Sequence, residues 1–589
     1  MVLIAVTLAT AAASAATAGP ASASELVYKG CIAAKSASHT EKGPCTVDPQ
    51  ARVYASTLAP SPDGQSLYTG IGIPCDKLED FCSADATVGR FDLDQPTGSL
   101  DYRSCVTGVA DNRTTCTQIP HAAPGAVGAG LGDIQSLVVS PDGNSMYAAS
   151  PNPICGDADC YGGNALARFD RDPTTGAITY RGCITGDKRS GPSGSGACSD
   201  LPSATADGTA SGLNGLQSLA LSADGKSLYG TATRDSAIAT FDRDPQTGAL
   251  TYRGCITGDK RSGPSGSGAC TQIPTATADG SGSGLNGCCG SPFSGRPAPY
   301  PVLVSPDGTS VYVGADGLAQ FDRDPATGRL TYVGCIAGKG NRTAGKACQE
   351  IPGRVFDDLL VMSPDGRFVY AAEPGSPITQ LRRNPETGAL AYVRTVKGGQ
   401  GDSLALGDNG RILYRGSYSY RRISWYSVNR KTGRPHYTGC LTGNKNEKSC
   451  TPIRTATGGG YNSGLEKVGV IAASRRMLYA YSQSSGADSG IAHFAVAPQT
   501  RIKKAKTGGH RATFKFRANP KSKFECKLKG KHVGRKLRHW RKCGSHGLKS
   551  KGKQTYRHLR PGKKLFRVRA TDHSKTTDPT PAKKRWRVR

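Results

Sequence analysis

The chain has 589 residues, including 76 Gly, 36 Pro and 20 Cys, and 37% of its residues are hydrophobic. This composition excludes a protein with many membrane spans, and the density of turn-forming residues excludes a helical bundle. Positive charge is concentrated at one end, because residues 501–589 contain 32 of the 76 Lys and Arg but 3 of the 45 Asp and Glu.

The chain begins with an apolar, Ala-rich stretch from Val2 to Ala18. It is too short to span a bilayer comfortably, and small residues suited to cleavage occur at Ala16 to Ala18 and Ala21 to Ala23, so it predicts a signal peptide over residues 1–23. The usual preceding basic residue is missing, which indicates a weak signal or a start upstream of Met1. Because no later stretch of about 18 apolar residues occurs, we expect an exported or cell-envelope protein without a transmembrane anchor.

The cysteines occur as pairs that are close in sequence, which is typical of disulfides formed outside the cytoplasm. Zinc is the alternative, but there is neither a C-x-x-C pair nor an accompanying His cluster. The spacing does not fix the partners of the adjacent Cys288 and Cys289. Six candidate disulfides share one context and three more stand apart: Cys31 with Cys45, Cys105 with Cys116, Cys183 with Cys198, Cys255 with Cys270, Cys335 with Cys348, and Cys440 with Cys450; then Cys75 with Cys82, Cys155 with Cys160, and Cys526 with Cys543.

Two markers repeat along residues 24–498, and each occurs seven times. The first is a tight turn, Ser-Pro-Asp-Gly in its fullest form, followed by an apolar-aromatic strand. The second is a Phe-Asp-Arg-Asp-Pro-x-Thr-Gly turn that leads into a strand with Tyr. The turns of the first marker begin at Ser61, Ser140, Ser222, Ser305, Ser363, Gly407 and Ser474, and the tyrosines of the second are Tyr28, Tyr102, Tyr180, Tyr252, Tyr332, Tyr392 and Tyr437.

Each repeat predicts four short antiparallel strands, which is the blade of a β-propeller. The chain starts with a Tyr28 strand that has no preceding hairpin, and the last hairpin ends near Val496 without an outer strand. Pairing the strand at Leu26 to Tyr28 with the strand at Ile491 to Val496 would complete a seventh blade and remove two sheet edges. The predicted fold class is therefore all-β, a seven-bladed propeller closed by the N-terminal strand.

These turns resemble those of the seven-bladed lactonase-like (YVTN-type) propellers, which include 6-phosphogluconolactonase-type and carboxymuconate-cyclase-type proteins. The resemblance covers roughly residues 25–498, and such motifs specify blades more than chemistry. It implies a lactone hydrolase acting in a central pocket as one candidate function. The cysteine loops depart from the family pattern, and no catalytic residue of the family maps onto this sequence, so the catalytic residues stay unknown.

Three other motifs have a functional and a structural interpretation. Gly401-Asp402-Ser403-Leu404 spells a hydrolase signature, but its place in the repeat makes Ser403 a blade-strand residue. The paired aspartates, for example Asp170 with Asp172, present oxygens suited to calcium, but they also stabilise tight turns. The histidines of the propeller occur in no repeated or paired context, which favours packing or surface roles: His39, His121, His436 and His493.

After a linker at residues 499–509, residues 510–589 predict a small basic β-sandwich. Apolar and cationic residues alternate with period two, so one row of side chains faces inward and a cationic row faces outward. The segment from Phe524 to Ala582 resembles Ig-like or fibronectin-like modules of bacterial secreted proteins, with Lys or Arg where neutral or acidic residues are expected. The residues predicted to bind polyanions are Lys515, Arg517, Lys527, Lys529, Arg567, Arg569, Arg585 and Arg587.

This charge predicts salt-dependent binding to anionic polymers, because neutralising them releases condensed counterions. Teichoic acid, acidic polysaccharide, anionic lipid and extracellular DNA all fit, whereas sequence-specific DNA binding lacks a helix-based motif. The alternative is that the charge only keeps an exported domain soluble, and a third interpretation makes the tail antimicrobial or nucleic-acid-binding. The leading hypothesis is a non-enzymatic binding or scaffold protein without cofactor or metal, whose propeller face offers a surface for a small molecule or protein.

Overall fold

The computed structural model describes residues 26–34, 45–48, 50–51, 53, 55–71, 86–94, 97–110, 115–123, 129–151, 164–192, 196–266, 268–286, 301–341, 343–353, 359–396, 398–460, 463–483, 489–544 and 547–589. The predicted signal peptide lies outside these residues. Within them the structure is all-β, with three 3₁₀ helices, η2 (Lys188–Ser190), η3 (Lys260–Ser262) and η4 (Arg535–Arg538), and no α-helix. Accordingly, the described part of the chain contains no helix with the length and apolarity needed to cross a membrane.

Residues 26–496 form seven sheets, which are numbered here in chain order of their first hairpins. Sheet 1 contains β3 (Thr57–Pro60), β4 (Ser66–Gly70), β5 (Thr87–Leu93), β6 (Leu100–Val109) and β7 (Thr117–Ala123). Sheet 2 contains β8 (Ser136–Val139), β9 (Ser145–Ser150), β10 (Ala165–Arg171), β11 (Ile178–Asp187) and β12 (Ser199–Thr205). Sheet 3 contains β13 (Leu216–Leu221), β14 (Ser227–Ala232), β15 (Ala237–Arg243), β16 (Leu250–Asp259) and β17 (Thr271–Thr277).

The other four sheets repeat this order of strands. Sheet 4 contains β18 (Val302–Val304), β19 (Ser310–Gly314), β20 (Leu318–Arg323), β21 (Leu330–Gly338) and β22 (Gln349–Ile351), and sheet 5 contains β23 (Leu359–Met362), β24 (Phe368–Ala372), β25 (Ile378–Arg383) and β26 (Leu390–Val396). Sheet 6 contains β27 (Ser403–Gly407), β28 (Ile412–Ser417), β29 (Arg422–Val428), β30 (Pro435–Asn444) and β31 (Thr451–Thr457). Sheet 7 contains β32 (Lys467–Ser474), β33 (Met477–Gln483), β34 (Gly490–Val496), β1 (Leu26–Ala34) and β2 (Thr46–Asp48).

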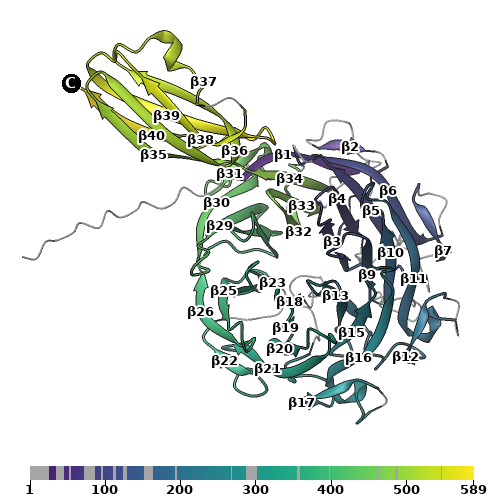
Figure 1. The fold of residues 1–589 in the computed structure, drawn as a ribbon. Coiled ribbons are helices and arrows are strands. Elements are labelled where there is room, and N and C mark those ends of the chain that lie inside the picture. Colours follow the sequence, from purple (N-terminus) through teal and green to yellow (C-terminus); the bar gives the residue numbers. More distant parts are fainter. Residues whose placement is uncertain are drawn as a thin grey trace, which may run out of the picture.

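The sheets are arranged as a β-propeller around a central axis (Figure 1). The first strand of each sheet contacts the first strand of the next, from β3 through β8, β13, β18, β23, β27 and β32, and β32 contacts β3 again. Apolar faces of neighbouring sheets pack together; Tyr68 and Val88 of sheet 1, for example, share a buried cluster with Met146 and Phe169 of sheet 2. These faces are hydrophobic because each strand presents its apolar positions to a neighbouring sheet.

The N-terminal strand lies in sheet 7, where the sequence predicts it. β1 pairs antiparallel with β34, with Leu26 opposite Val496 and Tyr28 opposite Phe494. The rings of Tyr28 and Phe494 meet edge to face at 5.5 Å between centroids, as those of Phe169 and Tyr180 do at 5.6 Å in sheet 2. The first and last parts of the ring are therefore joined by an aromatic contact that recurs in sheets 1, 2, 3, 4 and 6. Such a pair contributes about 1 kcal/mol in addition to its buried area.

The disulfides add an element that the sequence analysis did not predict. Six sheets have a fifth strand, parallel to the fourth, instead of the four expected. In each of them a disulfide joins the fourth strand to the residue just before the fifth, as Cys183 of β11 does with Cys198 before β12. Sheet 5 has no such cysteine pair and has four strands. The cysteine loops thus hold an additional outer strand.

Seven of the predicted disulfides are confirmed. They are Cys31 with Cys45, Cys105 with Cys116, Cys183 with Cys198, Cys255 with Cys270, Cys335 with Cys348, Cys440 with Cys450, and Cys526 with Cys543. The candidates Cys75, Cys82, Cys155, Cys160, Cys288 and Cys289 lie outside the described residues.

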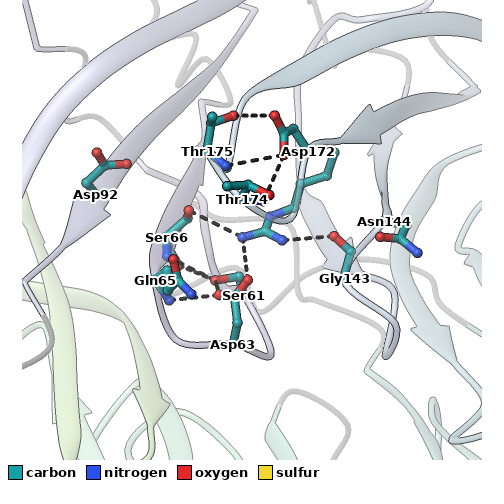
Figure 2. A network of polar contacts seen from close by, with 12 residues as sticks. Ser61, Asp63, Gln65, Ser66, Asp92, Gly143, Asn144, Asp172, Thr174 and Thr175 are labelled. Atoms are coloured by element: carbon teal, nitrogen blue, oxygen red, sulfur yellow. Dashed lines mark hydrogen bonds and ion pairs between the residues drawn. The ribbon is translucent and has the colours of Figure 1, made fainter.

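A buried arginine connects neighbouring sheets at four places. Arg171, the last residue of β10, donates hydrogen bonds to the Gly143 carbonyl (2.9 Å) and the Asp63 carboxylate (2.8 Å) (Figure 2). It also donates to the Tyr68 hydroxyl at 2.6 Å. Tyr68 in turn donates to the Gly176 carbonyl at 2.6 Å. We call this network the latch. The corresponding arginines are Arg243, Arg323 and Arg383, whose side chains are at most 1% exposed, while the last residues of β5, β29 and β34 are Leu93, Val428 and Val496.

The C-terminal module is a single hydrogen-bonded sheet whose longest strand serves two halves. It consists of β35 (Gln499–Gly508), β36 (Arg511–Gly530), β37 (Arg541–Lys542), β38 (Lys549–Tyr556), β39 (Gly562–Asp572) and β40 (Ala582–Val588). The first half of β36 pairs with β35 and β38, and the second half pairs with β37 and β39. Residues 499–508, which the sequence analysis placed in a linker, therefore form a strand of the module.

The two halves of the module face each other across an aromatic core. Phe514, from the first half of β36, stacks on Phe566 of β39 with ring centroids 4.0 Å apart. Phe516 and Phe524 meet edge to face at 4.9 Å. Because alternate residues of a strand point to opposite faces, the cationic residues between these aromatics lie on two outer faces of the module that point away from each other.

Candidate polyanion-binding surface

The structure divides the eight predicted polyanion-binding residues between these two outer faces. Lys515 and Arg517 lie on the first half of β36 and are exposed. The other six lie on the second half of β36 and on β39 and β40. We call the first surface the β38-side face and the second the β40-side face. The positive charge of these residues is thus divided between two separate faces.

On the β38-side face, cations stand side by side across three strands. Lys515 of β36 is opposite Lys504 of β35 and Lys553 of β38. Arg517 is likewise opposite Arg501 and Lys551. Directly opposed side chains in antiparallel strands lie about 5 Å apart at Cβ, and like charges at this distance destabilise a sheet. These two rows of three cations therefore cost folding free energy unless an anion lies over them.

A groove of about 790 Å³ runs over the same face. Its lining includes Phe516 and cationic side chains of β35, β36 and β38. The Phe516 ring is buried in the core of the module and points away from Lys515 and Arg517. Gly552 is needed here, because a Cβ at that position would stand 2.3 Å from the Phe516 ring. The groove therefore offers cationic side chains from three strands, which suits a chain of anionic groups.

The acidic residues of the module do not neutralise this face. Glu525 forms an ion pair with Arg569 at 2.8 Å on the β40-side face. Asp572 is 5% exposed and accepts hydrogen bonds from Ser574 and the Thr576 amide. Asp578 is 3% exposed and accepts from the Thr500 amide at 2.9 Å, and burial raises its pKa. All three carboxylates of residues 501–589 are thus engaged elsewhere.

The β40-side face is also cationic, but one acid and one aromatic residue moderate it. Lys527 is opposite Arg567, which is opposite Lys583. Trp540 lies between two cations, with Lys527 Nζ 4.3 Å and Arg569 Cζ 4.4 Å from its ring centroid. Burial lowers the pKa of Lys527, and the charges of Lys529, Arg567 and Arg569 lower it further. This face contains the other predicted residues, Lys529, Arg585 and Arg587.

Four of the six cations in the two rows of the β38-side face were not predicted from the sequence: Arg501, Lys504, Lys551 and Lys553. Lys549, Lys551 and Lys553 nevertheless alternate with small or polar residues at period two. That pattern was a usable strand signal. What it could not give is the register, which places these lysines beside Lys515 and Arg517.

The propeller residues weighed for catalysis or metal binding do not converge. His121 and His436 are exposed on outer strands β7 and β30, and His39 lies outside the described residues. His493 is buried in β34, where burial and then the nearby charges of Lys29 and Arg454 lower its pKa to about 4. The seven inner strands, all within the described residues, contain no His, Asp or Glu.

Ser403 and the paired aspartates have structural roles. Ser403 begins the inner strand β27, opposite Gly416. Asp170 pairs with Arg168 and Arg181, and Asp172 accepts hydrogen bonds from the Thr174 amide and the Thr175 hydroxyl. Among the described residues there is no group of three or more His, Cys, Asp or Glu placed to hold a metal ion.

Comparisons with known proteins find solved structures with a similar fold but identify no family. No protein-family model matches this chain, and no curated protein matches it by sequence. The periplasmic gluconolactonase of Pseudomonas aeruginosa is similar with a TM-score of 0.41 and 14% identity, over 68% of this chain and 88% of that one. The β-propeller domain of Myceliophteria thermophila Cps50 (Swd1) is similar with a TM-score of 0.43 and 11% identity, over 76% and 98%.

Proposed function

We propose that this protein is an exported binding or scaffold protein whose C-terminal module attaches it to anionic polymers of the cell envelope or surroundings. In this proposal residues 1–23 are a signal peptide, residues 24–498 are a seven-bladed propeller closed by β1, and the module from about residue 510 is an Ig-like sandwich to which β35 contributes an edge strand. The seven disulfides favour an oxidising compartment.

The observation that carries the proposal is the β38-side face. Two rows of three cations stand on neighbouring strands without an acidic partner among the described residues. A charge kept only for solubility has no need of such rows, because scattered cations serve equally well and avoid cross-strand repulsion. A polymer with an anion every few ångströms relieves the repulsion along the whole face.

The test measures polymer binding of the full chain against salt. Labelled long-chain polyphosphate serves as the probe, with wild type compared with the triple variant Lys504→Gln, Lys515→Gln, Lys553→Gln. Each phosphate contact contributes roughly 0.7 to 0.9 to the slope of log K against log salt. Loss of three contacts is expected to lower the slope by about 2 and the affinity at low salt by about tenfold or more.

The matched control removes the same charge from the propeller, by Lys226→Gln, Lys260→Gln and Lys339→Gln. These lysines are exposed and lie far from the module in sequence. The control is expected to keep the wild-type slope. A β38-side variant that binds polyphosphate with the same slope as this control would show that the face is not the binding surface.

A further inference from the structure

A cavity of about 600 Å³ lies where the module adjoins the propeller. The module meets the ring beside β30, β31 and β34 (Figure 1). On the propeller side the cavity is lined by the turns before β28, after β29 and between β32 and β33; on the module side it is lined by β35, β36 and β38. A volume of this size is within the range of small-ligand sites.

The lining is strongly cationic. Six cationic side chains and one carboxylate line the cavity: Arg411, Arg430, Arg476, Arg501, Arg517 and Lys551, with Asp408. Asp408 is already paired with Arg476 at 3.1 Å, and Arg476 also donates to the carbonyls of Val496 (2.7 Å) and Ala497 (3.0 Å). Arg476 and Asp408 therefore form a wall that joins the ring to the start of the module.

The remaining cations are available to a ligand. Arg411 and Arg430 come from the propeller and are exposed, and Arg517 and Lys551 come from the module and are exposed. None of these four forms an ion pair with an acidic side chain of the described residues. Positive charges from the propeller and from the module thus line the same cavity and repel one another. A bound anion would offset this repulsion.

The cavity lies where the latch of the propeller is absent. At the ends of β29 and β34, Val428 and Val496 stand in place of the latch arginine, and Val428 lines the cavity. The hydroxyl of Tyr414, the counterpart of Tyr68 in sheet 6, is buried and has no hydrogen-bond partner among the described residues. The part of the ring next to the module thus lacks the buried arginine that connects sheets at four other junctions.

We propose that this cavity binds a short, linear phosphate-bearing group, a phosphodiester or phosphoanhydride segment, held between the propeller and the module. Five of the six cations are arginines, whose planar guanidinium groups bind phosphate oxygens in pairs. A linear phosphate segment carries several charges within the length of the cavity, which a single carboxylate does not. The inference rests on the proposed function in one respect, since Arg501, Arg517 and Lys551 belong also to the β38-side face.

The test uses tripolyphosphate and the full chain, with binding measured by titration calorimetry. The wild type is expected to bind one tripolyphosphate, and the double variant Arg411→Gln, Arg430→Gln is expected to bind it at least about tenfold more weakly. The control Arg234→Gln, Arg329→Gln removes two exposed arginines elsewhere on the propeller and is expected to keep wild-type affinity. Unchanged thermal melting of both variants shows that they fold.

The outcomes separate this inference from the proposed function. Equal tripolyphosphate affinity in the wild type and the Arg411, Arg430 variant, or no binding to the wild type, overturns the cavity site. The β38-side triple variant substitutes none of the cavity residues, so it is expected to lose long-chain polyphosphate and retain tripolyphosphate. If instead it retains the long chain, the polymer-binding proposal fails while the cavity site stands on the Arg411, Arg430 result alone.

Discussion

Arginine and lysine have opposite roles in the two parts of this molecule. In the propeller, Arg171 and its three counterparts are buried, and each is surrounded by a carboxylate, a tyrosine hydroxyl and further oxygens from two sheets. In the module, Lys515 and its neighbours are exposed and face other cations. Buried cations require such partners, whereas exposed cations do not. A cation is therefore a structural connection in the latch and an exposed charge beside like charges on the β38-side face.

The largest expected effect comes from removing one latch. Arg243→Met removes the guanidinium that pairs with Asp142 and donates to the Tyr147 hydroxyl and the Gly225 carbonyl. Because the carboxylate is partly buried, we expect a loss of about 3 to 4 kcal/mol in the free energy of local unfolding, measured by hydrogen exchange of β14 and β15 amides.

The matched control for the latch is an exposed arginine of the same sheet. Arg253 is 57% exposed and pairs with Asp242 at 2.6 Å. Arg253→Met is expected to cost less than about 1 kcal/mol, as exposed ion pairs usually do. Equal costs for the two variants would mean that burial does not distinguish the latch arginines, and the comparison with the module would fail.

The next effect concerns the disulfide of sheet 2. Its cysteines are 15 residues apart, so Cys183→Ser with Cys198→Ser is expected to lower the free energy of unfolding by about 2 to 3 kcal/mol. The exchange protection of β12 should fall first, because the disulfide joins its start to β11. Protection of β26 in sheet 5, which has no disulfide, serves as the internal reference; a uniform loss across both sheets would contradict a local role.

A smaller loss of stability is expected when the pH is lowered. Burial by itself raises the pKa of Asp307, but hydrogen bonds from Ser305 and Arg383 outweigh it and lower the pKa to about 2. A carboxylate with a lowered pKa in the folded state stabilises the protein above about pH 4, and this contribution disappears between about pH 4 and pH 2. Allowing for the partial exposure of Asp307, we expect about 1 kcal/mol.

This pH dependence is checked by thermal melting of the wild type and Asp307→Asn at pH 2, 4 and 6. The variant should lie below the wild type at pH 6, and the gap should narrow towards pH 2. A gap that is the same at all three pH values would show that the charge of Asp307 does not contribute.

The smallest expected effect is a gain, not a loss, in the free energy of unfolding. Lys515→Glu places a carboxylate between Lys504 and Lys553, which replaces two repulsions by two attractions. The module should become more stable by about 0.5 kcal/mol while its polyphosphate affinity falls. Lys521→Glu is the control, because Lys521 also lies in β36 but has no lysine opposite it in the described strand pairs. If Lys515→Glu instead lowers the stability of the module, repulsion among Lys504, Lys515 and Lys553 does not destabilise the sheet.

Much of the ring could be read from local patterns. The turns beginning at Ser61 and Ser140 fix hairpins because Asp and Gly stabilise tight turns, and the pairing of β1 with β34 followed from the unmatched ends of the repeat. The cysteine pairs gave the disulfides but not the fifth strands, because a strand of three to seven residues between Gly-rich loops has no pattern of its own.

Local sequence patterns could not predict the latch or the cavity. Arg171 looks like any turn residue in Phe-Asp-Arg-Asp-Pro, and its partners Asp63 and Tyr68 are more than 100 residues away. The same holds for Arg411 and Arg517, which line one cavity only because β35 follows β34 almost directly.

The sequence by itself determined the repetition of the hairpins, the partners of the seven disulfides in the described residues and the sign of the charge on the module, since these depend on residues near one another in the chain. The tertiary structure decided which cations are neutralised and which are not. Lys504 and Lys553 oppose Lys515 only through strand register, and Arg243 meets Asp142 only across two sheets. The energy of a charge depends on burial and on partners at 3 to 5 Å, and the fold alone sets both.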